Sequence, residues 1–298
     1  MKRNILLLLL LLLVVGVLVG STDASAQGSM EELFHWQGRL AEDQWIEVKG
    51  VNGSISATAT DGDMVEVMAR GSQIPEAAVR FEVVEHPGGV TICAVYPIDD
   101  NDCQPGDEGR LRVNSGKSAR VEFTVQVPPG VAFAGRTVNG SVTASDLSGD
   151  VEARTVNGSI DLSTAGHARA ETIHGRIRAA IGSAEWQGEA AFESVNGSVT
   201  VAVPDSIDAE VYLQTVNGSI NTELPIAMTG QLTKRRRLVE GTLGHGGREL
   251  RVTTTNGSVW LRRRTAESAA QHSINDGAAA GVVSRIIQRI VHRIQLIR

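Results

Sequence analysis

The chain has 298 residues, a formal net charge of −6 and only 4% aromatic residues. Its acidic balance gives no reason to expect a nucleic-acid partner. Large aromatic rings usually fill the core of a globular enzyme, whereas Val, Ile, Ala and Leu fill thin stacked sheets. The composition therefore favours a repetitive, non-enzymatic protein, and no motif that we find requires a cofactor.

The first residues are typical of a protein that is exported. A basic head is followed by an apolar run over 5–19 and then by Ala24-Ser25-Ala26. This order predicts a secretory signal peptide over 1–26, cleaved after Ala26. The apolar run is also about long enough to cross a bilayer, so an uncleaved anchor is the alternative. We expect an exported bacterial protein that is periplasmic, attached to the cell surface or secreted.

Residues 27–131 are predicted to form an N-terminal β cap or first coil. Within them, the alternating segments 79–84 and 90–96 surround a Pro-Gly-Gly turn and indicate an inserted hairpin. Cys93 and Cys103 lie ten residues apart. After an export signal, such a pair predicts a disulfide that closes a loop.

The loop around the second cysteine is strongly acidic. Carboxylates are the ligands that calcium prefers, but the spacing here matches neither an EF-hand nor a Gly-rich calcium repeat. We expect a solvated acidic loop and no metal, with a calcium site as the alternative. The residues concerned are Asp99, Asp100, Asp102, Asp107 and Glu108.

A five-residue unit, Val-Asn-Gly-Ser-Ile at 51–55, recurs along the chain with little change. From 139 onward, the steps between its second residues are 18, 17, 22, 21 and 39 residues. The last step is about twice the period, and we interpret 239–243 as an eroded intermediate copy. The second residues of the units, including a histidine in a degenerate copy, are Asn52, Asn139, Asn157, His174, Asn196, Asn217 and Asn256.

The repeat unit predicts how the chain folds locally. Asn-Gly is preferred in tight turns because both residues tolerate positive φ, and the flanking residues alternate between apolar and polar as in a half-buried strand. A unit of about 18–22 residues cannot bury its own apolar face, but stacked units can. Stacked Asn side chains can form a hydrogen-bonded ladder. The sequence therefore predicts an all-β protein with a parallel β-solenoid (β-helix) over 132–264; a hairpin meander is the alternative.

These residues carry a family resemblance. The opening 34–39, the unit at 46–55 and the later Val-Asn-Gly-Ser units are similar to the adhesin-associated family DUF4097 over roughly residues 34–264. The resemblance implies a β-helix-like fold outside the bacterial cytoplasm and a role in adhesion. It implies no catalytic residues.

The C-terminal part of the sequence changes character. Residues 265–278 are small and polar and are predicted to be a linker, and 279–298 are predicted to form a basic amphipathic helix. Such a helix could cap the solenoid or contact a partner, or it could lie on an anionic membrane. The contact residues would be Arg285, Arg289, Arg293, Ile286, Ile290 and Ile294.

The predicted function is adhesin-like binding or envelope scaffolding, with an envelope polymer, a glycan or a protein as partner. One alternative is a peripheral membrane protein that regulates the response to envelope stress through the basic helix. The other is a polysaccharide-active enzyme on a β-helix, which would need clustered carboxylates. The 21-residue spacing of Asp150 and Glu171 would allow them to stack on adjacent coils, and the further candidates are Asp146, Glu152 and Asp161.

Overall fold

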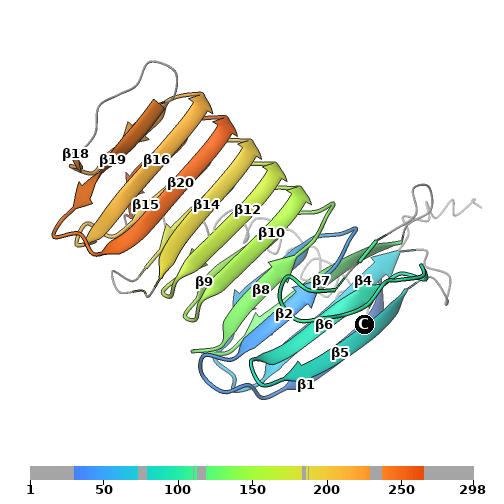
Figure 1. Ribbon diagram of the computed structural model, residues 1–298. Helices are drawn as coiled ribbons and strands as arrows, with labels where there is room; N and C mark the ends of the chain where they lie inside the picture. Colours follow the sequence, from blue (N-terminus) through green and yellow to red (C-terminus); the bar gives the residue numbers. More distant parts are fainter. Residues whose placement is uncertain are drawn as a thin grey trace, which may run out of the picture.

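The computed structural model describes residues 30–72, 79–109, 111–112, 119–182, 186, 188–228 and 237–264. These residues form two long β-sheets that face each other along an elongated body (Figure 1). They contain strands and no helix, so the described residues include no helix that could cross a membrane. The prediction of an all-β protein is confirmed.

Sheet A has ten strands and sheet B has eleven. In spatial order, sheet A contains β1 (Glu31–Gly38), β4 (Val65–Ser72), β7 (Arg120–Val127), β3 (Ile55–Ala59), β9 (Val142–Leu147), β11 (Ile160–Thr164), β13 (Ile177–Ile181), β15 (Val199–Val203), β21 (Val259–Arg263) and β17 (Ile220–Thr222). Sheet B contains β18 (Ala227–Met228), β19 (Arg237–Leu243), β16 (Ala209–Asn217), β20 (Arg248–Asn256), β14 (Glu189–Asn196), β12 (Ala168–His174), β10 (Val151–Asn157), β8 (Ala132–Arg136), β2 (Trp45–Lys49), β6 (Gly89–Val95) and β5 (Arg80–His86).

Each central coil consists of one strand of sheet B, an Asn-Gly turn and one strand of sheet A. We call this turn the Asn corner. Neighbouring coils pair in parallel and in register, for example β10 with β12 and β11 with β13. Parallel pairing confirms the solenoid and shows that the hairpin meander is wrong for these coils. The predicted helix over 279–298 lies outside the described residues.

The core lies between the two sheets and is built from the inward residue of every second position. In β10 the burial alternates strictly, with Val151 and Ala153 buried and Glu152 and Arg154 partly exposed. The residue after each corner turn forms a buried column up to the end coil, where Ile220 is partly exposed, because coils in register place equivalent side chains about 4.8 Å apart. Its members include Ile55, Val142, Ile160, Ile177, Val199 and Val259, each at most 1% exposed.

The coils do not stack in sequence order at the C-terminal end. The last coil, β20–β21, lies between β14–β15 and β16–β17. The expected intermediate copy at 239–243 is not a coil, because it belongs to β19, which pairs antiparallel with β16. The chain then turns at 244–247, where three glycines adopt positive φ and Asp208 accepts a hydrogen bond from the His245 amide at 2.8 Å. This turn carries the chain past the end of β16.

The N-terminal end is built in a similar way. Strand β2 lies between β6 and β8, and β3 lies between β7 and β9, so the first coil is covered by strands that come later in the chain. β5 and β6 form a hairpin where the sequence predicts one. β1 and β4 extend sheet A by antiparallel pairing.

The glycine of the Asn corner is required because the backbone of a neighbouring coil lies very close to it. Positive φ was the expected reason, but of the corner glycines only Gly53 has it, at 130°. A Cβ on Gly158 would instead run into the carbonyl oxygen of Gly140, and the same relation links Gly175 to Gly158. Because the chain of one corner lies directly against the carbonyl of the next, only glycine fits.

In every corner except the first, a hydroxyl two residues before the Asn or His donates a hydrogen bond to the glycine carbonyl of the neighbouring corner. Thr155 Oγ1 donates to Gly140 O at 2.8 Å, and Thr172 Oγ1 donates to Gly158 O at 2.9 Å. At the end of the stack, the Arg237 guanidinium donates to Gly218 O in place of a further threonine. The remaining donors are Thr137, Ser194, Thr254 and Thr215.

Replacing one of these hydroxyls should measurably weaken the solenoid. Thr172 is 4% exposed, so Thr172→Val leaves the Gly158 carbonyl without its side-chain donor while keeping the shape of the side chain. We expect the free energy of unfolding to fall by about 1 kcal/mol. Urea unfolding followed by circular dichroism measures this loss. Thr172→Ser keeps the donor and should lose less; equal losses for both variants would show that the hydroxyl contributes nothing.

Candidate functional site

The seven predicted ladder residues come together along one edge of the solenoid. Asn139 Nδ2 donates to Asn52 Oδ1, and Asn157 Nδ2 donates to Asn139 Oδ1, both at 2.8 Å. His174 takes the equivalent place, with its Nδ1 3.1 Å from Asn196 Nδ2. Because the last coil is inserted, Asn256 lies between Asn196 and Asn217.

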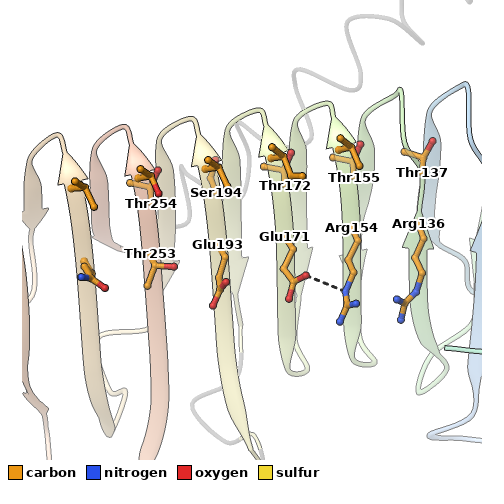
Figure 2. Close-up of a pocket in the computed structure, with 16 residues that line it drawn as sticks. Arg136, Thr137, Arg154, Thr155, Glu171, Thr172, Glu193, Ser194, Thr253 and Thr254 are labelled. Carbon is orange, nitrogen blue, oxygen red and sulfur yellow. Dashed lines mark ion pairs between the residues drawn. The ribbon is translucent and has the colours of Figure 1, made fainter. Parts of the chain in front are cut away.

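Beside this ladder, the outward face of sheet B is hollowed into a shallow groove of about 680 Å³. We call it the sheet B groove. It crosses the coils from β8 to β16, and Figure 2 shows its lining side chains arranged in repeated positions on neighbouring strands. Its length follows from the stacking, since every coil contributes the same positions.

One side of the groove is an exposed, mainly aliphatic column, formed by the residue just before the Asn or His of the five corners from Asn157 onward. Ile173, Val195 and Val216 are 43%, 42% and 43% exposed. An isolated exposed aliphatic residue needs no explanation, but a contiguous row on one face is typical of a contact surface. In stack order, the column is Val156, Ile173, Val195, Thr255 and Val216.

Two residues earlier on each strand, a polar column runs parallel to the aliphatic one. Its charge changes sign along the solenoid, from arginine on the early coils to glutamate on the central coils (Figure 2). Arg154 and Glu171 meet at this change, with Arg154 Nε 3.5 Å from Glu171 Oε2. In stack order, the column is Arg136, Arg154, Glu171, Glu193, Thr253 and Gln214.

The acidic loop borders the N-terminal end of the groove. Asp107 forms ion pairs with both Arg136 and Arg154. Lys49 Nζ donates to the carbonyl oxygens of Gln104 and Gly106, each at 2.5 Å. The loop is therefore held against sheet B by side chains of three different strands.

Beneath the loop lies a buried charged cluster. Glu47 is 4% exposed and Lys49 is 7% exposed; the Glu47 carboxylate lies 2.7 Å from Arg136 Nε and 3.7 Å from Lys49 Nζ. It also accepts hydrogen bonds from Thr91 Oγ1 and the Gly106 amide, both at 2.9 Å. The Glu47 carboxylate therefore contacts two cations and anchors the loop.

Burial and neighbouring charges shift the pKa values of this cluster. Burial lowers the pKa of Lys49, and the charge of Glu47 offsets this only in part. Burial alone would raise the pKa of Asp107, but the hydrogen bond from Arg136 and the charges of Arg136 and Arg154 outweigh it and hold that pKa below 3.8. Burial would lower the pKa of Arg136, yet Glu152 and Glu47 raise it. Asp107 and Arg136 are thus held in their charged forms.

The predicted disulfide is present. Cys93 and Cys103 are bonded with their Cα atoms 5.8 Å apart, and Cys93 is fully buried on the outer side of β6 under the loop. The bond ties the loop to sheet B next to the Lys49 contacts.

Removing the disulfide should release the loop and destabilise the N-terminal end. For the double variant Cys93→Ser/Cys103→Ser we expect the free energy of unfolding to fall by about 2–3 kcal/mol, because the unfolded chain regains the freedom of a ten-residue loop. Urea unfolding gives the loss. Limited proteolysis should show faster cleavage within 104–109 than in the wild type, and equal rates would contradict the anchoring role of the bond.

The structure does not gather the acidic loop residues into a metal site. Among the residues described, no group of three or more His, Cys, Asp or Glu side chains is placed to hold a metal ion. Asp107 faces arginines, and Asp100 lies in a turn with φ of 70°. The calcium alternative gains no support.

Of the candidate catalytic carboxylates, Glu152 and Glu171 both contact Arg154 Nε, at 2.9 and 3.5 Å. Asp150 and Glu171 were expected to stack, but Glu171 lies opposite Arg154, whereas Asp150 accepts a hydrogen bond from the His167 amide at 2.7 Å. This expectation is wrong because β10 and β12 are offset by 17 residues rather than 21. Asp161 lies on sheet A, where it pairs with Arg178 at 3.6 Å.

Several predicted elements lie outside the described residues, among them the signal peptide over 1–26, the linker and the C-terminal basic segment.

The sheet B groove was not predicted from the sequence. Its signal is present in the sequence, because a branched aliphatic residue precedes the Asn in almost every unit, on the strand face opposite to the residues that fill the core.

Taken together, the parallel coils, the two facing sheets and the corner ladders define a β-solenoid. Residues 131–262 match the family model described as Toastrack DUF4097, so the family predicted from the sequence is confirmed over this part of the chain. The predicted extent began at residue 34, and the family model does not cover the N-terminal part of it.

Two solved structures resemble the chain distantly. A "putative cell adhesion protein" from Clostridium sporogenes is 9% identical, with a TM-score of 0.42, and the match covers 78% of this chain and 100% of that one. A "putative adhesin" from Bacteroides fragilis is 13% identical, with a TM-score of 0.32, over 80% of this chain and 99% of that one. No curated protein matches the chain.

Proposed function

We propose that the protein is an exported, non-enzymatic binding or scaffold protein that contacts its partner through the sheet B groove. The observation that carries the proposal is the aliphatic column. Ile173, Val195 and Val216 are 42–43% exposed in a row interrupted only by Thr255, beside a row of polar and charged groups. Apolar contact flanked by polar groups is the usual composition of a binding surface.

The groove favours an extended partner over a compact small molecule. Its features repeat at every coil, about every 4.8 Å, and it is shallow and open along its length. A linear envelope polymer, a glycan chain or an extended protein segment can contact several coils at once. Each contact is weak by itself, and their number supplies the affinity.

Export is part of the same proposal. The sequence over 1–26 has the order of a secretory signal, and a disulfide persists in an oxidising compartment. A partner in the cell envelope is consistent with both features.

The proposal is tested by co-sedimentation of the purified mature chain, 27–298, with isolated envelope material. The variant Ile173→Lys/Val195→Lys places two charges in the aliphatic column, and we expect its apparent affinity to fall about tenfold or more. Thr143→Lys/Thr200→Lys adds the same charges to the outer face of sheet A and serves as the matched control. Equal binding by the wild type and both variants would overturn the proposal, as would turnover of a polysaccharide by the purified chain.

A parallel sample with anionic lipid vesicles tests the membrane alternative. If the mature chain sediments with vesicles and not with envelope material, the regulatory role through the basic segment replaces the proposal. If it sediments with envelope material alone, the solenoid is the binding element.

A further inference from the structure

The central and C-terminal part of sheet B has a strong excess of negative charge on its outer face. The outward residues of β12, β14, β20, β16 and β19 include six glutamates and two arginines. We call this region the acidic half of sheet B. The glutamates are Glu171, Glu189, Glu193, Glu210, Glu240 and Glu249, and the arginines are Arg169 and Arg251.

The two arginines do little to neutralise this surface. Both pair with the same carboxylate, Glu189, with Arg169 Nη2 at 3.6 Å and Arg251 Nε in direct contact. Within the described part of the chain, Glu193 and Glu240 have no ion-pair partner. Glu193 borders the aliphatic column, so this end of the sheet B groove combines exposed apolar side chains with uncompensated negative charge.

The sequence of the same chain contains a segment of complementary chemistry. Residues 279–298 include four arginines, Arg285, Arg289, Arg293 and Arg298, and no acidic residue. A row of isoleucines recurs at helical spacing beside them, at 286, 290, 294 and 297. In a helix, the distance from the first to the last of these isoleucines would be about 17 Å, at 1.5 Å per residue.

The dimensions of the groove and the segment agree. The aliphatic column from Val156 to Val216 covers four strand spacings, or about 19 Å. The described chain ends at Arg264, directly after β21, in the same part of the solenoid. The fourteen residues of 265–278 can extend to about 48 Å, while two packed sheets lie about 10 Å apart, so the segment can reach the outer face of sheet B.

We propose that residues 279–298 dock on the acidic half of sheet B as an amphipathic helix. The isoleucines cover the aliphatic column, and Arg289 and Arg293 lie beside Glu171 and Glu193. Apolar burial stabilises the contact, and the charges select this end of the groove over the arginine end.

The test is photo-crosslinking in the intact mature chain, 27–298, with benzoylphenylalanine in place of Ile290. Without vesicles, we expect a cross-link within one chain, mapped by mass spectrometry to peptides of β12, β14, β20 or β16. The substitutions Glu171→Lys/Glu193→Lys should lower its yield about fivefold. Adding Arg289→Glu/Arg293→Glu should restore it, because the charges are exchanged rather than lost.

The control is Asp161→Lys/Asp205→Lys, which changes the charge equally, away from the groove, and should leave the yield unchanged. Cross-links to sheet A, cross-links only between chains, or labelling of lipid alone when anionic vesicles are added would each overturn the docking. If the proposed function also holds, the docked segment competes with the envelope partner for the groove. The cross-link tests the docking alone, and co-sedimentation tests the proposed function, so either proposal can fail without the other.

Discussion

Gly158→Ala is expected to lower the free energy of unfolding by more than about 3 kcal/mol. The added Cβ would overlap the carbonyl oxygen and carbon of Gly140, which are backbone atoms and cannot rotate away. Relief requires the two corners to separate, and separation breaks the bond from Gly140 N to Asn157 O at 3.1 Å and the hydroxyl bond from Thr155 to Gly140. Stability in a stacked fold depends on each interface between neighbours, so the loss falls on the middle of the solenoid.

The measurement is urea unfolding followed by circular dichroism, with Gly62→Ala as the matched control. At Gly62 the nearest atom to an added Cβ is the Thr60 hydroxyl at 3.6 Å, which is ordinary contact. We expect the control to change stability by no more than about 0.5 kcal/mol. If Gly158→Ala is as stable as Gly62→Ala, the corners do not approach as closely as described.

Glu47→Ala is expected to cost about 3–5 kcal/mol, because it leaves the buried Lys49 without its carboxylate and removes one of the three carboxylates that contact Arg136. Glu47 and Lys49 are almost completely buried, and the Arg136 side chain is 17% exposed. The variant should also free the acidic loop, since the Gly106 amide loses its acceptor. Urea unfolding measures the loss, and proteolysis within 104–109 reports on the loop.

The pH dependence of the free energy of unfolding, compared between the wild type and Glu47→Ala, provides a second test of the cluster. The pKa of Lys49 in the folded protein lies below the 10.5 of the unfolded chain, so folding favours the neutral amine. Stability contributed by Lys49 therefore rises as pH increases toward 10.5. Glu47 raises the pKa of Lys49, so in Glu47→Ala that pKa should fall further and stability should depend more strongly on pH.

The control is Glu66→Ala, which breaks the exposed pair with His35 and should cost less than about 1 kcal/mol. Similar losses for Glu47→Ala and Glu66→Ala would show that the buried cluster is not a structural anchor.

Much of the fold could be predicted from the sequence because each unit carries its own local signal. The recurring Asn-Gly-Ser turn and the alternating residues beside it indicate both the corners and the strands, and parallel stacking follows from their repetition. The disulfide could be predicted from the spacing of Cys93 and Cys103. These are features of short segments or of a simple repeat.

The order of the coils could not be predicted in this way. The unit at Asn256 is almost the same as those at Asn196 and Asn217, so nothing local specifies which coils are neighbours. The order of the coils depends on β19, which pairs with the outer edge of β16 and leaves the other edge of β16 free to pair with β20. The groove depends on this order as well, because Thr255 lies between Val195 and Val216 in the aliphatic column.

The role of the corner glycine was predicted for the wrong reason, because contacts between coils are invisible in one unit. Positive φ is a property of a single residue, whereas the clash of a Cβ on Gly158 involves a residue 18 positions earlier. The same holds for Asp107, whose partners Arg136 and Arg154 lie 29 and 47 residues away.

The insertion of the last coil underlies the ladder, the groove and the docking surface, and paired cysteines test it most directly. In the mature chain, Val195→Cys/Thr255→Cys places the two Cα atoms one strand spacing apart, about 4.8 Å, within the range of a disulfide. Val195→Cys/Val216→Cys places them about two spacings apart, beyond that range. Under mild oxidation, we predict a bond in the first variant and free thiols in the second, read by mass spectrometry. A bond between 195 and 216, with free thiols at 195 and 255, would mean that the coils stack in sequence order and would contradict the account.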